Sequence, residues 1–469
     1  MEATVEINQP YIETNQPNIV FILTDHFRRD TIRSETTPNL SRLAREGVNF
    51  QAAYTASPLC QPARNAIIAG KYNFQTGICG NSSPPFNEVL RHDTFMWHLK
   101  RGGYATAMIG KHHYMGFLPG TDAVELAQEA VKDYGFDHVV QVLDDYENWK
   151  TTDAYTRHLE SKGLLQQLRD RFANWDHGNL IHCFSDEGDT VDGFVRNQAL
   201  AYIKEASTDQ PFYLNVSFVG PHPPYWYPAS CETYKPEDMP VTPRDIPAER
   251  ETTAFNRAAY MNRCAVLDRY VGDLVAALKA KGVYDNTLIL FSSDHGDMLG
   301  EFGIWDKRYF YEPSAGIPFI LSGFGISGDN LHRGRLDRSL VSNLDIYPTF
   351  LAAAGIDMPE SSKRPGINLL AKLNGNDRLK RRAVFSELGT AVMVRTGTWK
   401  LVYDPQAGGI QYLFNLANDP NEETNLANLP GYEAVSLDLV SLILNERIRL
   451  TQYAHLKEEQ RVMRISVGY

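Results

Sequence analysis

The feature that most constrains the fold is a series of short apolar runs, rich in β-branched residues, that alternate with amphipathic segments. A run of this kind is typical of a strand buried on both faces of a parallel sheet. The runs occupy residues 18–24, 105–109, 212–218, 287–293 and 318–321. Because strands alternate with helices, we predict an α/β fold built on a large mixed, mostly parallel sheet flanked by helices.

Two segments have the apolar spacing of amphipathic helices. One begins at Pro38, and the other runs from Arg257 to Lys281, where Gly282 ends the pattern. Between them, residues 120–200 are rich in charged and aromatic side chains. We expect this segment to be an insertion that covers one end of the sheet as a lid.

The pattern changes near residue 375. Short apolar runs at 383–387, 391–396, 400–403 and 412–415 follow one another closely, and a helical pattern lies near 433–451. These runs predict a smaller C-terminal antiparallel sheet plus helix. We therefore expect a large α/β domain at 1–375 and an α+β subdomain with a tail at 376–469.

Charge and length exclude several classes of protein. The 469 residues include 46 Lys and Arg against 57 Asp and Glu, which gives a formal net charge of −11. This balance argues against a nucleic-acid partner, which normally requires a basic face. No apolar run approaches the roughly 20 residues of a membrane span. The N-terminal residues have neither the basic nor the apolar region of a signal peptide, so we expect a cytoplasmic protein, unless a leader has been trimmed.

Two Asp-His pairs directly follow predicted strands. Asp25-His26 comes after the first strand, and Asp294-His295 comes after the strand at 287–293. In open α/β sheets, ligands bind at the carboxyl ends of strands. One such pair alone is typical of a turn or a helix cap. Two pairs of carboxylate and imidazole at strand ends together predict a metal site.

Cys60 stands at the predicted start of a helix. The five cysteines are odd in number and scattered, unlike a disulfide framework or a zinc ribbon. In the run Cys60-Gln61-Pro62-Ala63-Arg64, Pro62 suits the first turn of a helix. Cys60 would then lie where backbone amides favour an anion, with Arg64 one turn further on. A buried, unreactive cysteine before a helix is the alternative interpretation.

Three more motifs carry cations or imidazoles. Lys111 and His113 follow the strand at 105–109 and face the same side of an extended chain. His222 lies in a loop that prolines on both sides stiffen. Lys307 follows the Asp294 motif, although a lone lysine is usually a solvated surface group. With Arg64, these residues predict a pocket in which cations hold a tetrahedral oxyanion and histidines move protons.

Taken in order, these motifs resemble those of the sulfatase family within the alkaline-phosphatase-like superfamily. The resemblance extends from about Pro17 into the C-terminal subdomain, and its central motif is Cys60-Gln61-Pro62-Ala63-Arg64. The run from Leu413 to Leu426 is similar to the C-terminal signature of the family.

The resemblance implies hydrolysis of sulfate monoesters, of carbohydrate or aryl type, to an alcohol and inorganic sulfate. It implies that Cys60 is oxidised to formylglycine by a maturase, which would be a protein partner. A hydrated aldehyde has two hydroxyls on one carbon: one attacks sulfur, and the second collapses to the aldehyde and expels sulfate. An ordinary serine or cysteine lacks that second hydroxyl.

The resemblance also implies a role for each matching position. Asp25, Asp294, His295 and the modified residue 60 look like metal ligands. The remaining implied roles are Arg64 for orienting the hydrate, Lys111 and Lys307 for holding sulfate oxygens, His222 as general acid, His113 as base, and Asn81 as a further contact to the oxyanion.

One position departs from the family pattern. Many sulfatases have two adjacent aspartates after the first strand, and the second position here is His26. The family usually binds calcium, a hard ion that prefers oxygen ligands, whereas two imidazoles suit manganese or zinc better. Either His26 is a ligand and the divalent metal differs, or His26 supports the site and calcium stays.

Two other functions stay open. Phosphonate monoester and phosphodiester hydrolases share the cysteine-derived nucleophile, but their relatives often lack the pair formed here by Lys111 and His113. An unmodified Cys60 would leave an inactive anion-binding homologue. The tail at 446–469 also leaves open a homo-oligomer in which it packs on a neighbouring subunit.

Overall fold

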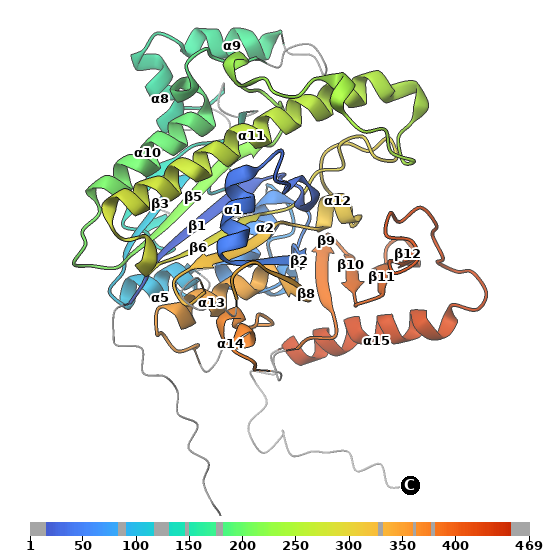
Figure 1. Cartoon of the computed structure of the whole chain (residues 1–469). Coiled ribbons are helices and arrows are strands. Elements are labelled where there is room, and N and C mark those ends of the chain that lie inside the picture. The colour runs from blue at the N-terminus through green and yellow to red at the C-terminus, as the bar shows by residue number, and fades with distance from the viewer. Residues whose placement is uncertain are drawn as a thin grey trace, which may run out of the picture.

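The structure is a computed structural model that describes residues 16–82, 91–116, 131–145, 150–174, 182–326, 332–359, 363–376 and 380–451. Its centre is an eight-stranded sheet with the strand order β4-β3-β5-β1-β6-β7-β2-β8 (Figure 1). The strands are β1 (Asn18–Asp25), β2 (Val48–Tyr54), β3 (Ala105–Gly110), β4 (His138–Gln141), β5 (Phe212–Pro221), β6 (Thr287–Ser293), β7 (Phe319–Gly323) and β8 (Arg335–Ser342).

All neighbouring strands of this sheet pair in parallel except β7, which is antiparallel to both β6 and β2. The predicted α/β fold with a mixed, mostly parallel sheet is therefore confirmed. The five predicted strands are present, and β2, β4 and β8 are additional strands that the apolar pattern did not reveal.

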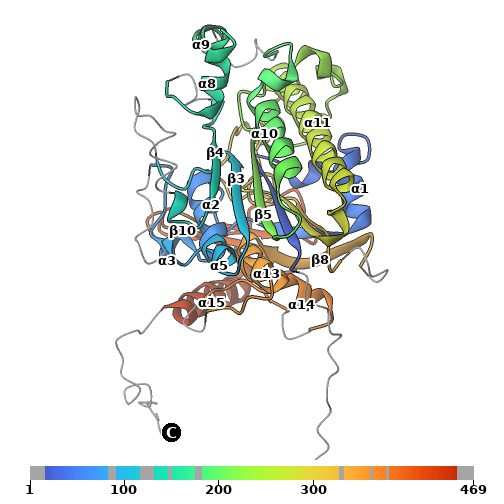
Figure 2. The same ribbon diagram turned by 90° about the vertical axis from the view of Figure 1, so that its left-hand side faces the viewer.

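Helices cover both faces of the sheet (Figure 2). The longer ones are α1 (Pro38–Glu46), α2 (Cys60–Ala69), α5 (Phe95–Arg101), α8 (Ala154–Ser161), α9 (Leu165–Ala173), α10 (Val191–Glu205), α11 (Arg250–Lys281) and α13 (Ile346–Ala353). Three short helices are α3 (Asn73–Thr76), α12 (Glu312–Ala315) and α14 (Leu369–Leu373). The helix predicted to end at Gly282 is α11, and Gly282 adopts the left-handed backbone at φ 79° that ends it.

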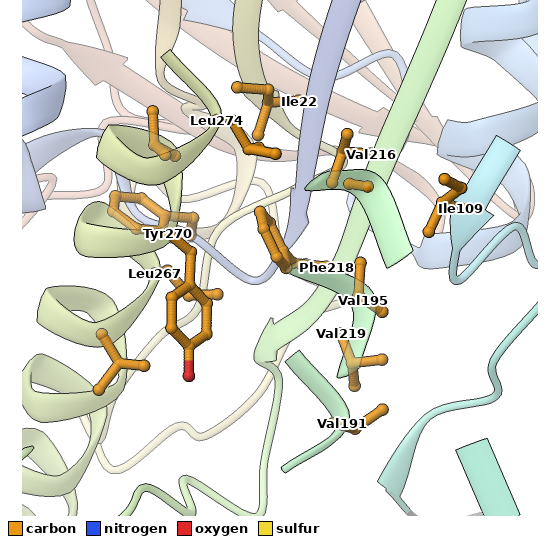
Figure 3. Packing of buried hydrophobic residues seen from close by; sticks show 14 of the residues in the cluster. Ile22, Ile109, Val191, Val195, Val216, Phe218, Val219, Leu267, Tyr270 and Leu274 are labelled. Atoms are coloured by element: carbon orange, nitrogen blue, oxygen red, sulfur yellow. The ribbon is translucent and has the colours of Figure 1, made fainter. Parts of the chain in front are cut away.

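Alternate residues of the buried strands serve two separate cores. In β1, Phe21 belongs to the cluster formed with α2, α5 and α13, whereas Ile22 belongs to the cluster formed with α10 and α11. Figure 3 shows the second cluster, in which Ile22 and Phe218 lie near Leu267 and Leu274 of α11. The two-residue period of a strand therefore explains why these strands are apolar throughout.

The C-terminal part of the chain forms a second, smaller sheet. Its four antiparallel strands have the order β12-β11-β10-β9, and one long helix follows them. The elements are β9 (Val384–Leu388), β10 (Ala391–Arg395), β11 (Trp399–Asp404), β12 (Gly409–Asn415) and α15 (Glu433–Leu450). The predicted antiparallel sheet plus helix is confirmed, and the division into 1–375 and 376–469 stays a prediction.

The predicted lid at 120–200 lies partly within the described residues. In this part, β4 adds a strand to the sheet edge and α10 packs in the core, while α8 and α9 project beyond α10 (Figure 1). A lid role stays a prediction for α8 and α9. None of the helices in the described part of the chain is long and apolar enough to cross a membrane.

A buried ion cluster joins the two sheets. Lys400 of β11 is fully buried, and its Nζ lies 2.7 Å from Glu312 and 2.6 Å from Glu422. The same ammonium donates to the carbonyl of Phe310 at 2.9 Å. Lys400 thus holds the segment before α12 against the C-terminal sheet.

The variant Lys400→Met should be strongly destabilised, because it leaves the buried Glu312 and Glu422 without their shared cation. We expect the free energy of unfolding to fall by about 3–5 kcal/mol. Urea unfolding measures this change, and Lys204→Met, on the exposed side of α10, is the control for the loss of a lysine. Equal midpoints for the two variants would contradict a stabilising role for the cluster.

A second prediction concerns His112, which is buried directly after β3. Its Nδ1 accepts the backbone N–H of Tyr114 at 3.1 Å, and burial lowers the pKa of His112 to about 3. Above pH 6.5 the imidazole is neutral in both folded and unfolded chains. Below pH 6.5 the imidazole binds a proton in the unfolded chain but stays neutral in the folded chain. The free energy of unfolding therefore falls by about 1.4 kcal/mol for each pH unit of acidification.

The variant His112→Asn keeps an acceptor for Tyr114 and removes the titrating group. From pH 7 to pH 5, the wild-type protein should therefore lose more stability to urea than the variant, by about 2 kcal/mol. Parallel losses for the two proteins would show that His112 titrates normally in the folded state.

Candidate active site

The predicted site residues converge at one edge of the large sheet. Asp25 is the last residue of β1, while Lys111 directly follows β3, His222 directly follows β5 and Asp294 directly follows β6. These four strands are parallel neighbours, so their carboxyl ends share an edge. The fold therefore brings together residues that are up to 269 positions apart in sequence.

Cys60 enters this edge from the first turn of α2. Its side chain is buried, and its Sγ lies 3.2 Å from His295 Nε2 and 3.7 Å from Asp25 Oδ1. Burial raises the pKa of the Cys60 thiol, but Lys307, Lys111 and His295 outweigh burial and hold this pKa well below its ordinary value. The position strongly favours an anion at residue 60.

Four donor atoms surround one point in this site. Asp25, Cys60, Asp294 and His295 each offer one ligand atom, and these atoms lie within 4.8 Å of one another. His295 Nε2 is 3.6 Å from Asp25 Oδ1 and 3.6 Å from Asp294 Oδ1. Ligands that share a divalent ion at about 2.0–2.6 Å are separated by distances of this size.

The Oδ2 atoms of Asp25 and Asp294 are bound by neighbouring cations. Arg64 donates through Nε to Asp294 Oδ2 at 2.8 Å and pairs with Asp25 Oδ2 at 3.2 Å. Lys111 Nζ lies 2.6 Å from the same Asp25 oxygen. Burial and Cys60 raise the pKa of Asp25, but Lys111 and Arg64 outweigh them and keep it well below its usual range. The Oδ1 atoms of Asp25 and Asp294 therefore face the ligand atoms of Cys60 and His295.

The imidazole of His295 is oriented in the same way. Its Nδ1 contacts the carbonyl of Gly296 at 2.9 Å, which fixes the proton on Nδ1 and turns the Nε2 lone pair toward the donor group. Carboxylate oxygens and an imidazole with their outer atoms already bonded fit a divalent metal. The four residues predicted as ligands are therefore placed together.

His26 lies at the rim of this group. Its Nδ1 lies 2.8 Å from Asp297 Oδ2, and its Nε2 lies 2.7 Å from Lys307 Nζ. Nε2 is also 3.6 Å from Asp25 Oδ1. The imidazole of His26 can either hydrogen-bond Lys307 or coordinate a metal ion through Nε2. Both predicted roles of His26 therefore stay open.

Lys307 connects His26 with His222. Its Nζ lies 3.0 Å from His222 Nε2, and the Nδ1 of His222 contacts the carbonyl of Pro223 at 2.6 Å. Burial, Lys307 and Lys111 lower the pKa of His222 well below its ordinary value, so this imidazole is neutral. A bound anion would raise the pKa of His222, because it favours the charged form of a neighbour.

The loop that carries His222 is fixed by a buried pair that the sequence patterns did not reveal. Arg263 of α11 donates to the carbonyls of His222 at 2.8 Å and Pro224 at 2.6 Å. Asp192 of α10 pairs with Arg263 at 2.9 Å and accepts the backbone N–H groups of Val219 and Gly220. This ion pair therefore sets the direction of the His222 side chain.

The remaining predicted residues lie around Cys60. His113 has a left-handed backbone at φ 49° and lowers the pKa of Cys60 through a hydrogen bond. Asn81 Oδ1 accepts the backbone N–H of Gln61 at 3.1 Å, so this atom supports the first turn of α2. Arg64 contacts the carboxylates, and its predicted role in orienting the nucleophile stays a prediction.

Several further acidic residues join the site. Asp297 orients His26 and accepts from Tyr225 at 2.9 Å. Asp144 lies 3.1 Å from Lys111 Nζ, and Asp306 lies 3.3 Å from Lys307 Nζ. Asp144 follows β4, a short strand that the apolar pattern did not indicate.

Comparisons with known proteins agree with this arrangement. The family model "Sulfatase" matches residues 17–356, and the model "N-sulphoglucosamine sulphohydrolase, C-terminal" matches residues 300–449. A choline-sulfatase of Rhizobium meliloti is 32% identical over 89% of this chain and 83% of that protein. An arylsulfatase of Clostridium perfringens is 28% identical over 89% of this chain and 92% of that protein.

Among solved structures, a phosphonate monoester hydrolase of Agrobacterium radiobacter has the same fold. The TM-score is 0.79 at 24% identity, over 94% of this chain and 98% of that chain. The family match covers well over half of the chain, and the strand ends bring together the motifs that carry it. This chain belongs to the sulfatase family of the alkaline-phosphatase-like superfamily and is a sulfuric ester hydrolase.

Proposed function

We propose that this protein hydrolyses sulfate monoesters through a formylglycine derived from Cys60, next to one divalent metal ion. The observation that carries the proposal is the position of Cys60, at the start of α2 and 3.2 Å from His295 Nε2. A maturase that oxidises Cys60 is part of the proposal. A cytoplasmic location and self-association through the tail remain predictions.

The metal would be held by Asp25, Asp294, His295 and residue 60, the four residues that share the donor group. Such an ion lowers the pKa of a bound hydroxyl and neutralises the charge of a bound anion. Calcium is the ion that the family usually binds, and it prefers oxygen ligands such as the carboxylates of Asp25 and Asp294. The imidazole of His295 leaves manganese and zinc as alternatives.

Two lysines, Lys111 and Lys307, are the proposed binding groups for the sulfate. Lys111 and Lys307 are both buried and both lie within contact of the residues around Cys60. Each also has an acidic neighbour, so the positive charge that remains for a ligand is small. This charge balance suits a singly charged sulfate or phosphonate monoester better than a doubly charged phosphate monoester.

His222 is the proposed proton donor to the leaving oxygen. Its neutral imidazole contacts Lys307, which holds a proton 3.0 Å from His222 Nε2. When the anion is bound, its charge raises the pKa of His222, so the imidazole can take up a proton and donate it to the leaving oxygen, while Lys307 keeps its own proton and its charge. His113, which hydrogen-bonds residue 60, is the proposed base for the release of sulfate.

The alternative function on the same site is hydrolysis of phosphonate monoesters or phosphodiesters. The pair formed by Lys111 and His113 favours sulfate esters, and both residues lie at Cys60. The ratio of kcat/KM on an aryl sulfate and the matching aryl phosphonate separates the two functions. We expect the sulfate to be preferred, and a strong preference for the phosphonate would overturn the choice.

The variant His222→Ala tests the proton donor. A poor leaving group needs a proton in the transition state, so kcat should fall by about 10²–10⁴-fold on an alkyl sulfate and much less on 4-nitrophenyl sulfate. Arg263→Lys, which disturbs the loop while leaving the imidazole, is the comparison for misplacement. Equal losses on both esters in His222→Ala would argue against the role of general acid.

A further inference from the structure

A cavity of about 290 Å³ lies directly beside the loop that carries Lys307. One of its walls is the segment 308–311, which follows Lys307, and the other is the face of the smaller sheet formed by β9 to β12. Ligand pockets in proteins have volumes of roughly 300–1,000 Å³, so this cavity lies at the small end of that range. The proposed mechanism uses none of the residues that line it.

Aromatic side chains form much of the wall. Tyr412 and Phe414 project from the same face of β12, and their ring centroids are 5.9 Å apart with an interplanar angle of 14°. Tyr311 packs on both rings, at 5.6 Å and 5.8 Å. Tyr309 adds a further ring that is 38% exposed. Such a wall offers flat apolar contact area together with phenolic hydroxyls, which suits a ring that carries hydroxyl groups.

Arg308 supplies the cavity with a positive charge that the fold does not neutralise. Its side chain is exposed and lines the cavity, and no hydrogen bond or ion pair with the described residues engages its guanidinium. Lys111 and Lys307 differ in this respect, because Asp144 and Asp306 lie beside them. Arg308 can therefore bind an anion without displacing a carboxylate of the protein.

The loop directs Lys307 and Arg308 to two adjacent places. Lys307 is buried in the site, whereas the next residue, with its Cα about 3.8 Å away, lines the cavity. Asp306 and Arg308 both have left-handed backbones, with φ 68° and 79°. This conformation is costly for arginine and is typical of ligand sites. The backbone N–H of Arg308 donates to the carbonyl of Pro58 at 3.0 Å, which holds the loop close to Cys60.

We propose that this cavity receives the alcohol part of the ester and that Arg308 binds an acidic group on that alcohol. The inference rests on the proposed sulfatase function and names its substrate class, which is ring alcohols that carry a carboxylate. In the complex, the sulfate group lies at Lys111 and Lys307, the ring lies against Tyr309 and Tyr412, and the carboxylate accepts hydrogen bonds from the guanidinium of Arg308.

The test compares pairs of esters that differ by one charge. Phenyl sulfates with a meta or a para carboxylate are matched by their carboxamides, which have nearly the same shape. A sulfated uronic acid and its neutral hexose counterpart form a saccharide pair, so that phenols and sugars are tested separately. We expect the wild-type enzyme, after maturation of Cys60, to prefer the carboxylate in the aryl or the saccharide pair by about 5–10-fold in kcat/KM. This is less than a fully buried charged hydrogen bond provides, because Arg308 is exposed in the free enzyme.

Arg308→Gln should remove this preference, because it removes the charge and leaves the backbone bond to Pro58. We expect kcat/KM to fall by about 5–10-fold on the carboxylate and by about twofold or less on the carboxamide. Arg308→Lys, which keeps the charge, should retain most of the preference. Arg45→Gln, at an exposed position on α1, is the control for the loss of one positive charge.

Binding of the alcohol alone separates the cavity from the chemistry. Ligand-observed NMR on protein with unmodified Cys60 measures the affinity of a hydroxybenzoate without turnover. The Kd should rise in Arg308→Gln and in Ala407→Phe, which places a larger side chain in the cavity from an exposed turn. In the matured enzyme, the same alcohol should inhibit hydrolysis of 4-nitrophenyl sulfate competitively.

Three results would overturn the proposal. They are the absence of a preference in both the aryl and the saccharide pairs, equal losses on carboxylate and carboxamide in Arg308→Gln, and non-competitive inhibition by the alcohol. Equal losses would show that Arg308 only holds the loop of Lys307, and non-competitive inhibition would place the cavity apart from the ester. Hydrolysis of 4-nitrophenyl sulfate would leave the sulfatase function intact in each case. Failure to hydrolyse any sulfate ester would overturn the proposed function itself, and the NMR measurement would still test the cavity.

Discussion

The buried guanidinium of Arg64 is the interaction on which the site depends. It pairs with both Asp25 of β1 and Asp294, which follows β6. Both carboxylates are buried away from solvent, so without this cation their negative charges would repel each other. By holding their outer oxygens it directs their inner oxygens to the point that Cys60 and His295 also face. The same residue donates to the carbonyl of Lys111 at 2.7 Å. One side chain thus aligns strand ends that come from three distant parts of the chain.

The parallel sheet explains why these residues lie side by side. Parallel strands deliver their carboxyl ends to one edge, and β4, β3, β5, β1 and β6 are consecutive neighbours in the sheet. Residues after these strands are Asp144, Lys111, His222, His26 and Asp294. The two strands nearest the centre, β1 and β6, position Asp25 and Asp294, the two carboxylates of the donor group.

The sequence predicted the strands that are buried on both faces, because their apolar runs need no tertiary information. It did not reveal β4, which is only four residues long and half-buried, or β8, whose N-terminal half is exposed and charged. The short motifs likewise named the residues that occupy the site. The groups that orient them were missed, because pairs such as Asp192 with Arg263 are 71 residues apart and leave no local pattern.

In the proposed mechanism, residue 60 works as formylglycine rather than as cysteine. The direct measurement is mass spectrometry of the peptide that spans residue 60, on protein produced with a formylglycine-generating maturase and assayed on 4-nitrophenyl sulfate in parallel. We expect a formylglycine mass whose fraction rises in proportion to specific activity. Full activity in a preparation whose Cys60 is entirely an unmodified thiol would contradict it.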